Sequence, residues 1–163
     1  MKKSKVDFSF NLTISDIENV DFINLLKDKL SDRTLAERFI VEIVESEDIR
    51  DYDIVKDFTK EMKDLGVRIA IDDFGSGFSN YQHILEIEPD YLKIDGSFIK
   101  DIHVNPKSFK LVKSISSFAE SMNIKTIAEF VSNKEIFSKT KELDIDQYQG
   151  FYFSEPLLGE YVV

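Results

Sequence analysis

The sequence predicts an α/β protein whose strands form a parallel sheet. Short stretches rich in Val, Ile, Phe and Tyr alternate about six times with longer stretches whose apolar residues recur every three to four positions. Hydrophobic residues make up 42% of the 163 residues, enough for a sizeable core. Because no linker or repeat interrupts this order, residues 1–163 are expected to form a single domain.

The apolar stretches predict six strands, at residues 6–13, 38–44, 66–72, 91–95, 125–129 and 146–153. Parallel strands that follow one another in a chain need a helical crossover, and that crossover is right-handed. Either a (β/α) barrel or a doubly wound open sheet satisfies this order of elements.

Four amphipathic stretches between these strands predict helices. The first starts at a capping-box pattern at residues 15–18, and the second covers residues 54–65 and ends before Gly66. The third has Pro106 near its start and runs to Met122, and the fourth starts at Asn133. The apolar face of each helix is expected to pack in the core.

The composition excludes several classes of function. A net charge of −10 argues against binding a nucleic-acid polymer or an anionic membrane surface. The absence of Cys excludes a disulfide scaffold and a thiolate metal site. No apolar run reaches the roughly 20 residues of a membrane span, and no apolar signal core follows the basic start. A cytoplasmic protein without direct membrane insertion is expected.

Polar residues stand near the end of each predicted strand, and each is about one strand–helix unit from the next. The ends of parallel strands converge on one mouth in a barrel, but they spread along an edge in an open sheet. The pattern therefore favours the barrel, with a mouth formed by Asn11, Glu42, Asp72, Asp73, Lys93, Glu129 and Gln149.

The four carboxylates in this set would repel one another without a cation. Together with the amide of Asn11 they offer hard oxygen ligands, which select Mg²⁺, Mn²⁺ or Ca²⁺. One member of the adjacent Asp pair can bridge two ions about 3.5–4 Å apart, as in two-metal phosphoryl chemistry, and Lys93 adds a positive charge near a water or a phosphate oxygen. An unrelated Mg²⁺-dependent barrel enzyme of the enolase type also fits these residue types.

Two segments resemble the centre of the EAL domain family, the bacterial cyclic di-GMP phosphodiesterases. They are Ile-Asp-Asp-Phe-Gly-Ser-Gly-Phe-Ser-Asn at 71–80 and Pro-Asp-Tyr-Leu-Lys-Ile-Asp-Gly-Ser-Phe at 89–98, with further matches at 42–45, 128–129 and 149–153. The resemblance implies a TIM-type (β/α) barrel of the EAL type. It also implies hydrolysis of cyclic di-GMP to linear pGpG with two Mg²⁺ or Mn²⁺ ions.

The resemblance further implies a role for each strand-end residue. Asn11, Glu42 and Asp72 resemble the ligands of one metal ion, and Asp72, Asp73 and Glu129 those of the second. Lys93 resembles the lysine that orients the attacking water, Gln149 a glutamine near the substrate, and Lys93, Glu129 and Gln149 form the expected catalytic set. The loop at 73–80 resembles one that supports metal binding and dimerisation.

The sequence also departs from the family pattern. No Glu-Ala-Leu precedes Asn11, so the barrel is expected to be incomplete at its N-terminus, and Phe130 and Ser132 stand where the family usually has Gly and Glu. We expect an open sheet edge, a homodimer or higher oligomer, and weak or no activity of this chain alone. A degenerate, non-catalytic EAL module that binds cyclic di-GMP or a protein partner is the alternative.

Overall fold

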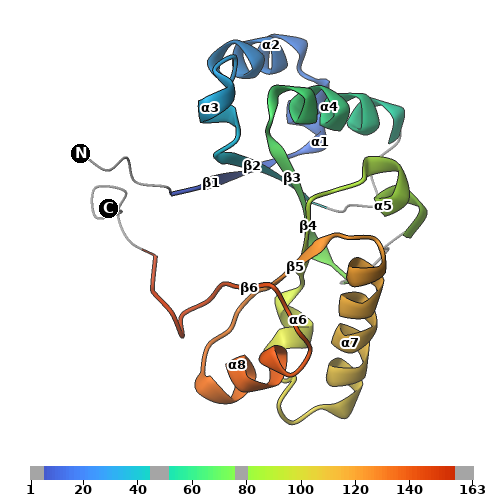
Figure 1. The fold of residues 1–163 in the computed structure, drawn as a ribbon, viewed down its shortest axis with the longest axis vertical. Coiled ribbons are helices and arrows are strands. Elements are labelled where there is room, and N and C mark those ends of the chain that lie inside the picture. The colour runs from blue at the N-terminus through green and yellow to red at the C-terminus, as the bar shows by residue number, and fades with distance from the viewer. Residues whose placement is uncertain (1–5, 45–51, 76–80, 157–163) are drawn as a thin grey trace. The chain divides into compact units, whose positions relative to one another are not determined.

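A computed structural model describes residues 6–44, 52–75 and 81–156 (Figure 1). These residues divide into two compact units. The amino-terminal unit comprises residues 6–72 and 81–90, and the carboxy-terminal unit comprises residues 73–75 and 91–156. Glu45 and most of the predicted loop at 73–80 lie outside the described residues.

The amino-terminal unit is built on parallel strands with helical crossovers. Its strands are β1 (Phe8–Leu12), β2 (Phe39–Val44) and β3 (Arg68–Phe74), whose last two residues belong to the other unit. β1 pairs with β2 and β2 with β3, both in parallel. Its helices are α1 (Ile14–Glu18), α2 (Val20–Lys29), α3 (Arg33–Ala36), α4 (Tyr52–Leu65) and α5 (Tyr81–Ile87).

The core of this unit lies between the strands and α4. Val41 and Ile69 on neighbouring strands are fully buried, as are Val55 and Met62 on α4, which packs against α1 and α5. The spacing of the apolar residues in α4 places them on one helical face, as the sequence predicts.

The predicted first helix is in fact two helices, and its capping box lies two residues earlier than expected. The backbone N–H of Asp16 donates to Thr13 Oγ1 over 3.2 Å, and the Thr13 N–H donates to Asp16 Oδ2 over 2.8 Å. Asn19 then ends α1 with an extended backbone and accepts from the Phe22 N–H over 3.1 Å, which starts α2. Asn19 therefore divides the predicted helix in two, because its side chain caps a new helix within the stretch of regularly spaced apolar residues.

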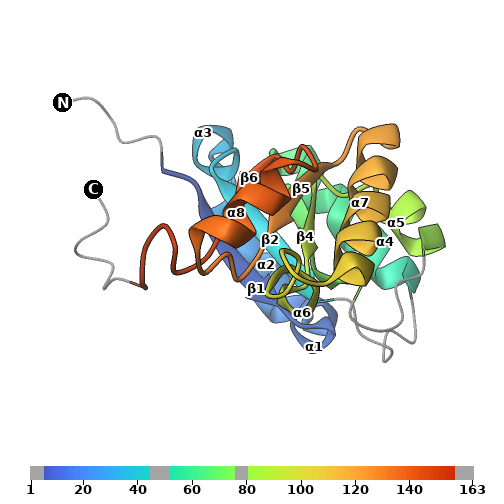
Figure 2. The same ribbon diagram turned by 90° about the horizontal axis from the view of Figure 1, so that it is seen from below.

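The carboxy-terminal unit repeats the same design. Strands β4 (Tyr91–Ile94), β5 (Lys125–Ala128) and β6 (Gln147–Tyr148) pair in parallel, β4 with β5 and β5 with β6. Its helices are α6 (Gly96–Ile99), α7 (Pro106–Ser121) and α8 (Lys134–Lys141), and α7 packs against β4 and β5 (Figures 1 and 2). Asn105 caps α7 at Pro106, which needs no donor at that position.

The last strand is much shorter than residues 146–153. Gly150 has a φ of 152°, and the space at its Cα is filled by the Val131 backbone, so the chain bends there. Residues 151–153 form a turn instead of continuing the ladder.

Aspartates placed just before strands hold the start of neighbouring strands. The side chain of Asp90, before β4, accepts a hydrogen bond from the Ile69 N–H over 2.8 Å, and the Asp90 N–H donates to the Ile69 carbonyl over 2.8 Å. Asp146, before β6, accepts from the N–H of Thr126 over 2.8 Å and from its hydroxyl over 2.9 Å. Such paired bonds fix the register of short strands, and register decides which face each side chain occupies.

Candidate active site

All of the predicted site residues lie at the carboxyl ends of strands. Asn11 is in β1, Glu42 in β2 and Lys93 in β4, while Glu129 and Gln149 directly follow β5 and β6. The structure corrects one boundary, because β3 continues to Phe74 and the Asp72–Asp73 pair lies within the strand instead of ending it.

Two predicted ligands of the amino-terminal unit are neighbours across a strand pair. Asn11 and Glu42 are Cα partners in the β1–β2 register, and the next strand places Ala70 opposite Glu42. Side chains of registered residues in parallel strands share one face, and alternation places Asp72 on the face of Ala70. Glu42 is only 8% exposed. A carboxylate withdrawn from water to this degree needs charged or hydrogen-bonding partners.

The carboxy-terminal unit brings three further predicted residues together. Lys93 Nζ lies 2.9 Å from Glu129 Oε1, and the two side chains are only 5% and 8% exposed. Glu129 and Asp73 also offer carboxylate oxygens within 4.8 Å of each other. Two carboxylates this close repel unless a cation lies between them or beside them.

The backbone of Asp73 is arranged unusually for a strand residue. Its φ is 54°, a left-handed conformation that Asp tolerates better than most residues. Such a conformation interrupts the alternation of side chains along a strand, so adjacent Asp72 and Asp73 need not face opposite sides. The donors are hard oxygens, which fit a divalent cation of the Mg²⁺, Mn²⁺ or Ca²⁺ class.

Gln149 is held beside Glu129 by the backbone. Its N–H donates to the Ala128 carbonyl over 2.8 Å, and its carbonyl accepts from the Val131 N–H over 3.0 Å. The two residues line a hollow of about 270 Å³ whose lining consists of Glu129, Phe130, Ser132, Gln149, Gly150 and Phe151. The predicted catalytic set thus lies in one unit, where Gln149 and Glu129 line the hollow and Lys93 is bonded to Glu129.

Sequence reasoning did not assign a role to Phe151, although it lines this hollow and is 70% exposed. Its position directly after Gln149-Gly is the signal that could have found it. An aromatic side chain two residues from a candidate site residue is a candidate contact for a flat ligand.

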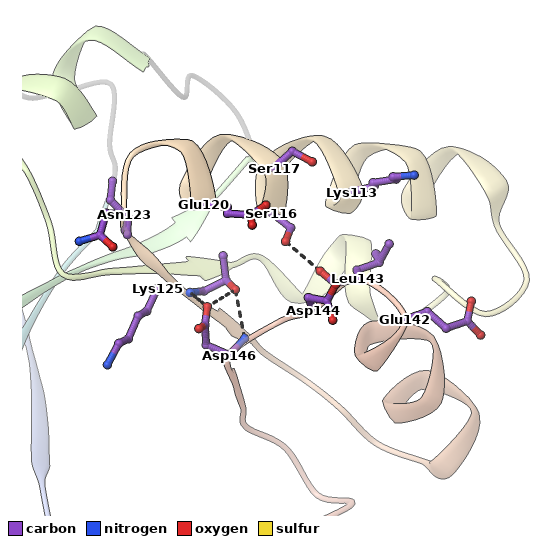
Figure 3. A pocket seen from close by; sticks show the side chains of 12 residues that line it. Lys113, Ser116, Ser117, Glu120, Asn123, Lys125, Glu142, Leu143, Asp144 and Asp146 are labelled. Carbon is purple, nitrogen blue, oxygen red and sulfur yellow. Dashed lines mark hydrogen bonds between the residues drawn. The ribbon is translucent and has the colours of Figure 1, made fainter.

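A second hollow lies at the amino-terminal end of β5 and is a less suitable reaction site. Its volume is about 570 Å³, and it is bounded by α7, the start of β5 and the segment after α8 (Figure 3). Several of its polar groups serve the fold: Asp146 binds Thr126, and the Ser116 hydroxyl donates to the Leu143 carbonyl over 2.9 Å. It lies at the end of β5 opposite Glu129.

Parallel strands joined by helices, with polar residues gathered at the carboxyl ends of the strands, define a barrel-like class of α/β protein. The chain matches the EAL domain family over residues 1–156 and belongs to that family. Over 150 residues it is 39% identical to cyclic di-GMP phosphodiesterase PdeA of Borreliella burgdorferi, an overlap of 91% of this chain and 22% of that protein. The chain therefore spans about a fifth of the length of this relative.

Solved structures agree with this assignment. The EAL domain of Mycobacterium smegmatis DcpA superposes with a TM-score of 0.87 at 25% identity, covering 94% of this chain and 70% of that chain. Klebsiella pneumoniae BlrP1, solved as a complex with manganese and cyclic di-GMP, gives a TM-score of 0.85 at 29% identity, covering 94% and 40%. The predicted fold class, an α/β fold of the EAL type, is confirmed. Among the described residues, no helix is both long and apolar enough to cross a bilayer.

Proposed function

We propose that this chain is the catalytic part of a metal-dependent phosphodiesterase that hydrolyses cyclic di-GMP to linear pGpG in bacterial second-messenger signalling. The observation that carries the proposal is the buried Lys93–Glu129 pair beside Asp73, at the strand ends of an EAL domain. The name of the Borreliella relative and the ligand of the Klebsiella structure support the choice of substrate. We further propose that residues 1–163 act as one domain, since one family match spans both units.

In the proposed reaction, water adds to one phosphorus, one P–O ester bond breaks, and the leaving oxygen takes up a proton. Lys93 stabilises the negative charge that develops on the phosphate oxygens, as positive groups in a water-poor site do. Glu129 holds the Lys93 ammonium in place through their 2.9 Å bond. Gln149, at the rim of the same hollow, supplies an amide that can orient the dinucleotide.

The proposed metal ligands are Asn11, Glu42, Asp72, Asp73 and Glu129, which together can hold two Mg²⁺ or Mn²⁺ ions. Their carboxylate and amide oxygens are the donors that both ions accept. When bound, these ions polarise the phosphodiester and lower the pKa of a coordinated water.

The test is incubation of the purified chain with cyclic di-GMP and Mn²⁺, with the products resolved by chromatography. We expect weak formation of pGpG, and we expect it to disappear in an Asp72→Asn, Asp73→Asn double variant. Asp57→Asn, Asp64→Asn is the matched control, because it makes the same change of charge on the exposed face of α4. If pGpG is absent with the unchanged chain, or persists in the site variant, the proposal is wrong.

A receptor that binds cyclic di-GMP without hydrolysing it is the second candidate. Ser132 favours it, because this residue lines the hollow beside Glu129 where the family resemblance implies a second Glu. Retention of cyclic di-GMP in equilibrium dialysis without pGpG would select this function over the first.

We also propose that the chain associates into a homodimer or higher oligomer. Among the described strands β1 pairs only with β2, and Phe8 in β1 is 44% exposed. A strand with an unpaired side and an exposed aromatic residue favours association with another chain. Light scattering coupled to size-exclusion chromatography tests this, and a monomer at assay concentration would contradict it.

A further inference from the structure

The hollow beside Glu129 contains an aromatic residue whose presence the fold does not explain. Phe130 has a φ of 52°, and a bulky side chain in this left-handed region is a backbone outlier. Its side chain is 67% exposed, so burial returns little of the free energy that the conformation costs. Strained residues that persist without a packing reason are concentrated at ligand sites.

The structure holds Phe130 in a defined place despite this exposure. The ring lies over Gly96, the first residue of α6, so closely that a Cβ built on Gly96 would be 2.1 Å from Phe130 Cδ2. Backbone hydrogen bonds of the next residue fix the segment: the Val131 N–H donates to the Gln149 carbonyl over 3.0 Å, and the Tyr152 N–H donates to the Val131 carbonyl over 3.0 Å. The ring is therefore presented to solvent by a rigid backbone.

The other residues of the hollow define what such a ring can bind. Phe151 gives a second aromatic side chain, and Gln149 gives an amide with both donor and acceptor atoms. Glu129 contributes a carboxylate that is paired with Lys93. A ligand suited to the hollow has a flat ring for the aromatic residues and polar edge atoms for the amide. A nucleobase combines both, and a volume of about 270 Å³ suits one base rather than a whole dinucleotide.

We propose that Phe130 is a specificity-determining residue that stacks on one guanine base of the cyclic dinucleotide, with Phe151 and Gln149 contacting the same base. This inference rests on the proposed function and adds to it the position of one base. Aromatic residues stack on bases through their faces, so the contact depends on the ring and not on the volume of the side chain.

The experiment compares the binding of a hydrolysis-resistant cyclic di-GMP phosphorothioate by three variants of the full 163-residue chain, in the presence of Mn²⁺. Phe130→Leu keeps an apolar side chain and removes the ring, so we expect at least a tenfold rise in Kd, as is typical for the loss of base stacking. Phe130→Tyr keeps the ring, and we expect a Kd within about threefold of the unchanged chain. Phe153→Leu is the matched control, since Phe153 is 50% exposed and lies outside the lining of the hollow.

A second readout separates stacking from a structural role. A cyclic dinucleotide that carries 2-aminopurine loses fluorescence when its base stacks, so the unchanged chain should quench it and Phe130→Leu should not. The thermal midpoint of Phe130→Leu should stay within about 2 °C of the unchanged chain, because the ring is mostly exposed.

Each outcome bears on the inference. If the unchanged chain binds and Phe130→Leu binds equally well, Phe130 does not stack on the ligand, while the proposed function stands. If Phe130→Tyr loses as much affinity as Phe130→Leu, the ring is not the determinant and the inference is wrong. If the unchanged chain binds no dinucleotide, the proposed function fails together with this inference.

Discussion

The contact between Gly96 and Phe130 predicts that a small, normally stabilising substitution will destabilise this protein. Gly96 begins α6 with a backbone outside the left-handed region, so Gly96→Ala alone should stabilise by about 0.4–1 kcal/mol through the unfolded chain. The added Cβ, however, would lie 2.1, 2.6 and 2.9 Å from three atoms of the Phe130 ring. Carbon atoms prefer a separation of about 3.5–4.0 Å, so the ring has to move.

The magnitude follows from the two opposing effects. Overpacking costs about 1–3 kcal/mol, and the lower half of that range applies because the exposed ring can swing toward solvent. We therefore expect Gly96→Ala to destabilise the folded state by roughly 0.5–1 kcal/mol, or a few degrees in thermal midpoint. Phe130→Gly removes both the ring and the strained backbone, so it should stabilise by about 1 kcal/mol.

Urea unfolding of the two single variants and the double variant forms a thermodynamic cycle. In the Phe130→Gly background the clash is absent, and Gly96→Ala should now stabilise, giving a coupling free energy of about 1–2 kcal/mol between the two positions. If the effects of the two substitutions simply add, the ring does not lie on Gly96 as the structure describes, and the rigid presentation of Phe130 is refuted.

Three further predictions concern other parts of the carboxy-terminal unit. Asp146→Ala leaves the buried N–H and hydroxyl of Thr126 without their acceptor, so the free energy of unfolding measured in urea should fall by about 2 kcal/mol. Asp146→Asn should lower it less, and an unchanged free energy would show that these hydrogen bonds do not stabilise the fold. Asn133→Ala removes the cap that accepts from the Ile136 N–H over 2.9 Å, and the free energy of unfolding should fall by about 1 kcal/mol. Hydrogen bonds from Asn105, and secondarily from Ser108, hold the pKa of Asp101 below its ordinary 3.8, so its stabilising contribution is present above that pH and is lost as the pH falls through the lowered pKa. Carboxyl NMR should show this pKa rising in Asn105→Ala, and an unmoved titration would contradict the assigned cause.

The positions of the strands could be predicted from the sequence because strand and helix have different apolar periods. The buried positions Val41, Ile43, Ile69 and Ile71 recur at every second residue in two short segments, while the apolar residues of α4 recur every three to four residues. The short helices α3, α5 and α6 were not predicted, since four to seven residues carry too little periodicity. The length of β6 was overestimated because the bend at Gly150 depends on contact with Val131, which is distant in sequence.

The strand-end positions of the candidate residues were predictable from the sequence, but their geometry was not. Whole strand–helix spacings place Lys93 and Glu129 at neighbouring strand ends, and the structure brings them to 2.9 Å. The left-handed backbone of Asp73 and the exposed ring of Phe130 could not be derived, because both depend on positive φ angles that residue type alone does not indicate. Alternation along an ideal strand would have turned Asp73 away from the face of Asp72.

The Lys93–Glu129 pair shows how the ladder of a parallel sheet sets the geometry of the proposed chemistry. In the register of β4 and β5, Lys93 is the partner of Ile127, so Glu129 lies two residues further along the same face. A slip of one residue between these strands would move Glu129 to the opposite face and replace a buried ion pair with two unpaired buried charges, a change that costs several kcal/mol. At the far end of β5, Asp146 binds both the backbone and the hydroxyl of Thr126 and so fixes the β5–β6 register from the other side. A residue at the opposite end of β5 from Glu129 therefore helps to set where Gln149, directly after β6, lies relative to Glu129.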